Sequence, residues 1–164
     1  MAQVGSVTTT KLAGLLTAAT GLPASVAAIA AGASIQIPEI TPSQIVAQNV
    51  AADIAEISLV TKYPAVHVYC EKATNQLKEK FRTFSGQAQM VVETRVSQDQ
   101  LQNLETQMQL YVEAVTSVLD ANRGDWGGGM FYGGGYEVSY GQVKHGGRNL
   151  LQIAKISFVV EVSM

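Results

Sequence analysis

The chain has 164 residues and a formal net charge of −2, with 47% hydrophobic and 15% charged residues. This composition is too apolar for a disordered chain, and its shortage of charge favours a surface that is partly covered in an assembly. The lack of a basic excess argues against a dedicated nucleic-acid-binding protein, and the single cysteine, Cys70, excludes an intramolecular disulfide and any metal site built from several cysteines.

The amino-terminal segment, residues 1–40, is rich in alanine and has no charged residue between positions 12 and 33. That stretch is long enough for a membrane span or a signal peptide, but alanine and glycine contribute little transfer free energy and Pro23 interrupts it. We therefore expect no membrane association. Two interpretations remain open: a pair of short helices broken at residues 21–23, or an arm whose small apolar face packs on a neighbouring subunit.

A helix is expected over residues 42–57. Thr41 and Gln44 have the spacing of a capping box, and Pro42 suits the first helical position. The apolar residues that follow recur close to the 3.6-residue period of a helix. They are Ile45, Val46, Val50, Ile54 and Ile57.

Residues 65–71 form the first expected strand, because Tyr63-Pro64 ends any preceding helix and the segment then alternates. His67 and Cys70 fall on opposite faces of it, so they cannot bind one metal ion together. A strand-buried Cys70 also lacks the surroundings that activate a thiol, and the chain has no Gly-x-Ser-x-Gly motif. We therefore expect no enzymatic activity, no cofactor and no metal.

Residues 73–97 predict a connection followed by a second strand. Leu77, Phe81 and Phe84 lie at helical spacing, which indicates a short helix or an ordered connection over residues 73–84. After Gly86 the chain alternates again and predicts a half-buried strand at residues 87–97. Glutamates of the strands are expected on the solvated face: Glu71, Glu93 and Glu137.

A long helix is expected from residue 97 to about Ala121. Ser97 and Gln100 have the spacing of a second capping box. At roughly 1.5 Å per residue this helix would be about 35 Å long, enough to cover a sheet of several strands. Its apolar stripe consists of Leu101, Leu104, Met108, Tyr111, Val112, Val115, Val118 and Leu119.

The glycine-rich insertion at residues 124–135 is the most unusual segment of the chain. It lacks the Gly-Lys-Ser/Thr ending and the flanking strand and helix of a phosphate-binding loop. One interpretation is a flexible, solvated loop. We favour a contact loop for another subunit or a partner, because glycines let exposed aromatic side chains adapt to a surface. Its contact residues would be Trp126, Met130, Phe131 and Tyr132.

The last expected element is an antiparallel hairpin of residues 136–143 and 150–162, whose even-numbered residues in the second strand face the core. Its turn carries Lys144, His145 and Arg148, a basic tip that is either solvated or in contact with an acidic partner or a phosphate. The predicted fold is α+β: an antiparallel four-stranded sheet packed by a long helix and an N-terminal helix, with an alanine-rich N-terminal arm.

This order of elements resembles that of the tail-terminator and neck proteins of tailed bacteriophages. The resemblance covers residues 41–164 and includes the opening Tyr-Pro-Ala-Val-His-Val-Tyr at 63–69 and the apolar last strand at 153–162. Residues 1–40 and 124–135 depart from that pattern. The resemblance implies a virion structural protein, assembled in the host cytoplasm as a hexameric ring at the phage neck. Such a ring ends the tail tube and joins it to the head connector, while DNA passes through without specific binding.

The charge of the chain is compatible with a conduit for DNA, because a lumen lined with many lysines would hold the phosphates. A closed ring also needs two different contact surfaces on each copy, and the N-terminal arm and the glycine-rich loop are the candidates. Two alternatives remain: another phage connector, tube-capping or minor capsid protein, and a small cytoplasmic ligand-binding α+β domain. The second would be a monomer or dimer with an enclosed polar pocket.

Overall fold

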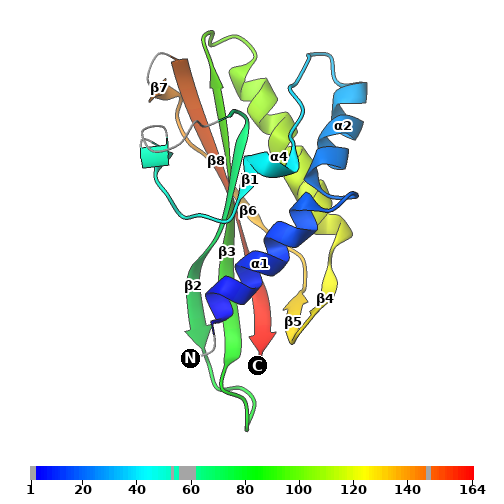
Figure 1. The fold of residues 1–164 in the computed structure, drawn as a ribbon, viewed down its shortest axis with the longest axis vertical. Coiled ribbons are helices and arrows are strands. Elements are labelled where there is room, and N and C mark those ends of the chain that lie inside the picture. The colour runs from blue at the N-terminus through cyan, green and yellow to red at the C-terminus, as the bar shows by residue number, and fades with distance from the viewer. Residues whose placement is uncertain (1–2, 53, 56–61, 147–148) are drawn as a thin grey trace.

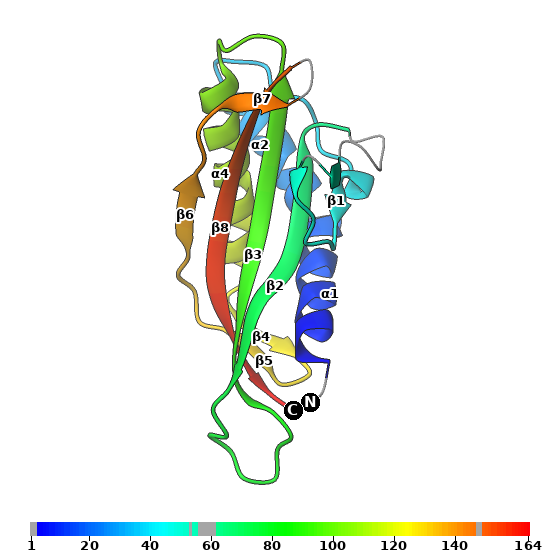
Figure 2. The ribbon, with the colours of Figure 1, turned by 90° about the vertical axis from the view of Figure 1, so that its left-hand side faces the viewer.

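The computed structural model has an α+β fold in which helices cover one face of a curled sheet (Figures 1 and 2). It describes residues 3–52, 54–55, 62–146 and 149–164. Three long antiparallel strands form the centre of the sheet, in the order β2 (Ala65–Asn75), β3 (Ser85–Gln98) and β8 (Asn149–Ser163). The predicted fold class is confirmed, and these three strands coincide with predicted ones.

The sheet differs from the predicted four-stranded antiparallel one, because short strands extend both of its sides. On one side, β1 (Ile45–Val46) pairs in parallel with β2, so the sheet is mixed. On the other side, β8 pairs in turn with β7 (Lys144–Gly146), β6 (Glu137–Tyr140) and β5 (Met130–Tyr132). The last of these also pairs with β4 (Gly124–Gly127). The predicted strand at 136–143 is thus shortened to β6, and β7 lies in the segment predicted as a turn.

The alanine-rich segment forms two helices, α1 (Val4–Thr17) and α2 (Leu22–Gly32). α1 packs across β2 and β3, and α2 packs on α4 (Leu104–Ala121). The apolar side chains of α1 and α2 belong to the same hydrophobic core as those of the sheet, so this chain itself covers that face. No helix in the described part of the chain meets the length and hydropathy of a membrane span by itself; α1 and α2 meet them only when counted together across a 41° bend.

The predicted helix over residues 42–57 is wrong for its first part. The capping box of Thr41 and Gln44 is formed, but it encloses only the single 3-10 turn η1 (Pro42–Gln44) before the chain enters β1. Gln44 donates a side-chain hydrogen bond of 2.8 Å to the carbonyl oxygen of Pro64, which fixes this turn beside β2. A helical turn follows near residue 52, and the predicted span from residue 56 onward lies outside the described residues.

Helix α4 begins seven residues later than predicted, since Ser97 and Gln98 continue β3 and pair with β8. Its 18 residues give a length of about 27 Å. The helix ends at Ala121 as expected, and its predicted apolar stripe is buried from Leu104 onward. Leu101 lies outside the helix and is 63% exposed.

Strand β3 is buried on both faces rather than half-buried. Glu93, predicted on a solvated face, is only 6% exposed and forms an ion pair of 2.8 Å with the buried Arg95. Glu71 and Glu137 are exposed, as predicted. The even-numbered side chains of β8 face the core, as expected: Ala154, Ile156, Phe158, Val160 and Val162.

Candidate contact surface at one end of the sheet

The connection between β2 and β3, residues 76–84, protrudes from one end of the long axis of the molecule (Figures 1 and 2). It is not helical, and its side chains are exposed except for that of Phe84, so the short helix predicted over residues 73–84 is wrong and the ordered connection is the correct alternative. Gly86 allows the two strands to approach closely, because a Cβ there would lie 1.9 Å from the carbonyl oxygen of Thr74. The connection is therefore the tip of a long hairpin.

Hydrogen bonds hold this tip in one conformation. The Asn75 side-chain oxygen accepts from the N–H groups of Leu77 at 3.1 Å and Ser85 at 3.0 Å. Its amide donates to the carbonyl oxygen of Thr83 at 3.2 Å. The hydroxyl of Thr83 donates in turn to the carbonyl oxygen of Met164, next to the end of β8. These contacts tie the tip to the C-terminal strand.

The tip exposes two large apolar side chains. Leu77 is 69% exposed and Phe81 is 104% exposed, whereas Phe84 at the base is fully buried. Leu77 and Phe81 also have positive φ angles of 50° and 68°. A left-handed conformation costs an L-residue roughly 1–2 kcal/mol, and such strain in folded proteins concentrates at functional sites. Apolar side chains held under strain in solvent are typical of a contact surface.

The polar residues of the tip are mainly basic. Lys78 and Lys80 make no ion pair within the described part of the chain. Arg82 lies 3.6 Å from the Glu79 carboxylate, and both side chains are more than half exposed, so this pair adds little stability. With three cations and one carboxylate, the tip carries a formal charge of +2.

A second hairpin, β4–β5, replaces the predicted glycine-rich contact loop. Three of the four predicted contact residues are core residues, because Trp126 is 6%, Met130 5% and Tyr132 0% exposed. The Trp126 ring lies 5.6 Å from that of Tyr132, which lies 5.1 Å from that of Phe158 in β8. The indole N–H donates to the carbonyl oxygen of Asn122 at 2.7 Å. The prediction that these three side chains are exposed is wrong.

Phe131 is the predicted contact residue that does lie on the surface, where it is 50% exposed. It alternates with two buried neighbours in β5 and pairs with Glu161 of β8. It also lines a shallow pocket of about 180 Å³ together with Lys78 and Glu79 of the tip. Phe131 and residues 76–84 therefore form one surface, which we call the contact end.

Sequence analysis missed Leu77 and Phe81 as surface residues. Their spacing of four residues fits one face of a helix, which predicts a helix or an ordered connection rather than an exposed hairpin tip. The better signal is the alternation on both sides of residues 76–84, which indicates two strands joined as a hairpin. A hairpin tip has no neighbouring layer to cover apolar side chains.

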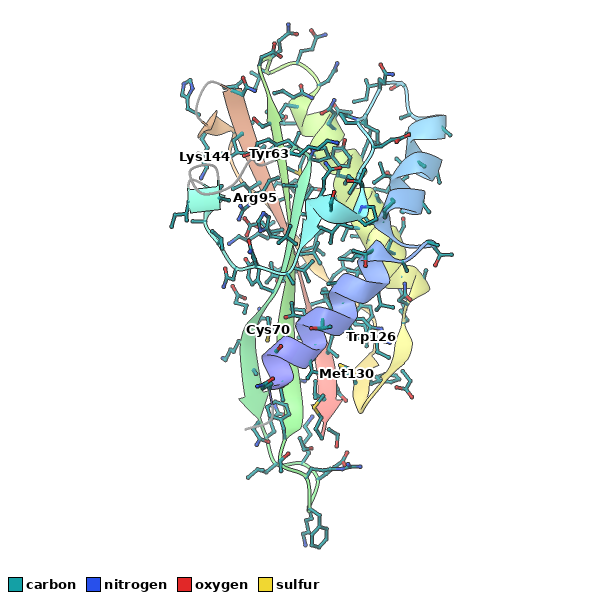
Figure 3. The ribbon with its side chains drawn as sticks, in the orientation of Figure 1. Tyr63, Cys70, Arg95, Trp126, Met130 and Lys144 are labelled. Carbon is teal, nitrogen blue, oxygen red and sulfur yellow. The ribbon has the colours of Figure 1, made fainter. Side chains whose placement is uncertain are left out.

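The predicted basic tip lies elsewhere. Figure 3 shows Trp126 and Met130 toward one end of the sheet and Lys144 toward the other, in agreement with the pairing of β5 and β7 to opposite ends of β8. Lys144 and His145 are exposed, and Arg148 lies outside the described residues. The structure therefore does not bring the basic tip together with the aromatic residues of β4–β5.

Lys144 and His145 instead line an open cleft of about 850 Å³, together with Tyr69, Glu93 and Lys155. The Tyr69 hydroxyl donates to the Glu93 carboxylate at 3.0 Å. Burial and the adjacent negative charge raise the pKa of Tyr69, so its hydroxyl stays protonated. The acidic and phenolic groups on the floor of the cleft are thus engaged with each other.

The remaining reactive side chains are not activated. Burial raises the pKa of the Cys70 thiol, which keeps it in its less nucleophilic form. Burial, together with the positive charge of Arg95, lowers the pKa of His67. Within the described part of the chain, no group of three or more His, Cys, Asp or Glu residues is arranged to hold a metal ion.

Comparison of the sequence with protein-family models and with curated proteins finds no match. The surfaces of the molecule are therefore what indicates its function. Of these, the contact end combines exposed apolar side chains, backbone strain and charge in one ordered segment.

Proposed function

We propose that the protein is a virion structural subunit that forms a ring at the neck of a tailed bacteriophage, where it ends the tail tube and joins it to the head connector. The observation that carries this proposal is the contact end. Leu77, Phe81 and Phe131 are exposed together on a part of the molecule that hydrogen bonds hold in place. Exposed apolar clusters on an ordered scaffold are typical of surfaces that another protein covers.

The order of the elements and the charge of the chain support the same function. Six copies would carry a formal charge of about −12, six times the −2 of one chain. A ring of this charge would not grip the phosphates of DNA that passes through it. DNA is therefore a transient passenger in this proposal, and the lasting partners are proteins.

Assembly into a ring requires two different surfaces on each copy. The alanine-rich helices do not provide one through their buried apolar residues, since α1 and α2 bury those against this chain's own sheet and α4. The contact end provides one surface, and the other must lie on a different part of the molecule.

Native mass spectrometry and negative-stain imaging of the purified full chain test the proposal. We expect closed rings of a single stoichiometry, six copies, whose population grows with protein concentration. A chain that stays monomeric at every concentration, with and without purified tail-tube protein, would contradict the proposal. Another connector, tube-capping or minor capsid subunit would also assemble, and imaging of the whole particle distinguishes these by the neighbours of the ring.

A second candidate function, binding of a small anionic ligand, is favoured by the open cleft. Lys144, His145 and Lys155 line it, and the two lysines attract negative charge. Thermal unfolding with inorganic phosphate or citrate tests this candidate. A rise in Tm that Lys155→Met abolishes would support it, and an unchanged Tm with both anions would count against it.

A further inference from the structure

We propose that the contact end of one copy docks on the corner between β3 and α4, residues 99–105, of the next copy in the ring. This inference rests on the proposed ring and names its second surface. The corner lies at the opposite end of the long axis from residues 76–84 (Figures 1 and 2). The 14 residues of β3 separate the two by about 46 Å, so they cannot meet within one chain.

The corner is acidic, whereas the tip of the contact end is basic. Asp99 and Glu105 are exposed, and neither carboxylate makes an ion pair within the described residues. They give residues 99–105 a formal charge of −2, opposite to the +2 of the tip. Two surfaces of opposite charge at opposite ends of one chain favour head-to-tail association, because like ends repel.

Exposed apolar side chains and positive φ angles also occur at both surfaces, the tip and the corner. Leu101 at the corner is 63% exposed, which matches the exposed Leu77 and Phe81 at the tip. Within the described part of the chain, the non-glycine residues with a positive φ are Leu77, Phe81 and Asn103. All three belong to one or the other of the two surfaces. A contact that buries both would cover these apolar side chains and pair their charges.

The open cleft is a poorer partner for the contact end. Its lining includes Lys144 and Lys155, and these would face Lys78 and Lys80 of the tip. Its one carboxylate, Glu93, already pairs with the buried Arg95 at 2.8 Å. Like charges placed opposite each other weaken an interface, so the acidic corner is the surface that fits.

A charge-exchange experiment tests the contact in the full chain. The variants are Lys78→Glu with Lys80→Glu, Asp99→Lys with Glu105→Lys, and all four substitutions combined. The control, Lys11→Glu with Lys72→Glu, makes the same change in net charge as the first variant at two lysines outside both surfaces, one in α1 and one in β2. The readout is the protein concentration at which half of the ring dissociates, measured by sedimentation and native mass spectrometry. Circular dichroism establishes that each variant folds.

We expect each charge reversal to raise that concentration at least about tenfold, and the combined variant to return to within about threefold of the native chain, because the exchanged charges attract again. The control should stay within about threefold as well. If the combined variant does not regain the native dissociation concentration, the contact is overturned, and the tip would instead bind a different acidic protein.

The test separates this inference from the proposed function. If the native chain forms rings and neither charge reversal weakens them, the contact is wrong and the ring stands. If the native chain forms no oligomer, the contact and the ring both fail. Rings lost in each charge reversal and recovered in the combined variant would support both.

Discussion

Two hairpins lie near the same end of the molecule. One buries its aromatic residues Trp126 and Tyr132, and the other exposes Phe81 at its tip. In the β4–β5 hairpin the turn has positive φ angles of 62° to 79° at Gly127, Gly128 and Gly129, where they cost little. Two of its three aromatic residues, Trp126 and Tyr132, pack into the core. At the tip of β2–β3 the positive φ angles fall on Leu77 and Phe81, whose side chains point into solvent. A glycine at either position would relieve the backbone strain. The presence of leucine and phenylalanine there instead indicates that their side chains serve a contact.

The largest expected effect concerns the aromatic residues of β4–β5. Trp126→Ala should lower the free energy of unfolding by about 3–5 kcal/mol, because it empties a buried site against Tyr132 and Phe158. Phe131→Ala, half-exposed in the same hairpin, should cost less than about 1 kcal/mol. Urea denaturation measures both. Equal losses would mean that the hairpin is not divided into a core face and a surface face.

A smaller effect is expected from the turn of β4–β5. A Cβ at Gly129 would lie 2.0 Å from the carbonyl oxygen of Ser163, whereas a Cβ at Gly127 would meet nothing within 4 Å. Both residues have a φ of 79°. Gly129→Ala should therefore destabilise the fold by about 2 kcal/mol or more, and Gly127→Ala by about 1 kcal/mol. Similar Tm values for the two variants would contradict the close approach of the turn to β8.

The sequence predicts the central sheet well because local pattern and tertiary environment agree there. Alternating segments bounded by Tyr63-Pro64, Gly86 and Gly146-Gly147 predict β2, β3 and β8. The even-numbered side chains of β8 are buried, as expected. The apolar stripe of α4 is predicted for the same reason. Its start is not, since the Ser97–Gln100 capping pattern is overridden by the pairing of Ser97 with Leu151 in β8.

The errors share a cause, namely that pairing with a distant strand decides the outcome. Thr41 to Gln44 fits a helix start, but the adjacent Ile45 and Val46 pair with β2 instead of continuing a helix. Met130 and Tyr132 are buried because β5 pairs with the far end of β8, where Met130 lies opposite Val162. Of the contact end, only Phe131 is predicted, since the helical spacing of Leu77 and Phe81 favours a helix over the hairpin that the flanking alternation indicates.

The contrast between buried and exposed side chains extends to the two histidines and predicts a pH effect. Burial lowers the pKa of His67 below its usual 6.5, helped by Arg95 and opposed by Glu93. Below about pH 6.5 the unfolded chain therefore binds a proton that the folded chain does not, so folding stability falls as the pH falls from neutral toward 5. His67→Gln should reduce this slope of Tm against pH. The exposed-histidine control, His145→Gln, should keep it, and parallel slopes for all three proteins would contradict the assignment.

The smallest effect on stability, and the sharpest for the comparison of the two hairpins, is expected from Phe81→Asn. Asparagine tolerates a left-handed backbone better than phenylalanine, and the Phe81 ring buries nothing in the monomer, with 104% exposure. The free energy of unfolding, measured under conditions where the chain is monomeric, should therefore stay within about 0.5 kcal/mol or rise slightly. Assembly should weaken, because the variant removes the most exposed apolar side chain of the contact end. Tyr140→Asn, at an exposed aromatic residue of β6 outside both surfaces, is the matched control and should leave assembly unchanged. A variant that melts earlier than the native chain would show that Phe81 stabilises the monomer, in which case its strained backbone would need no partner to explain it.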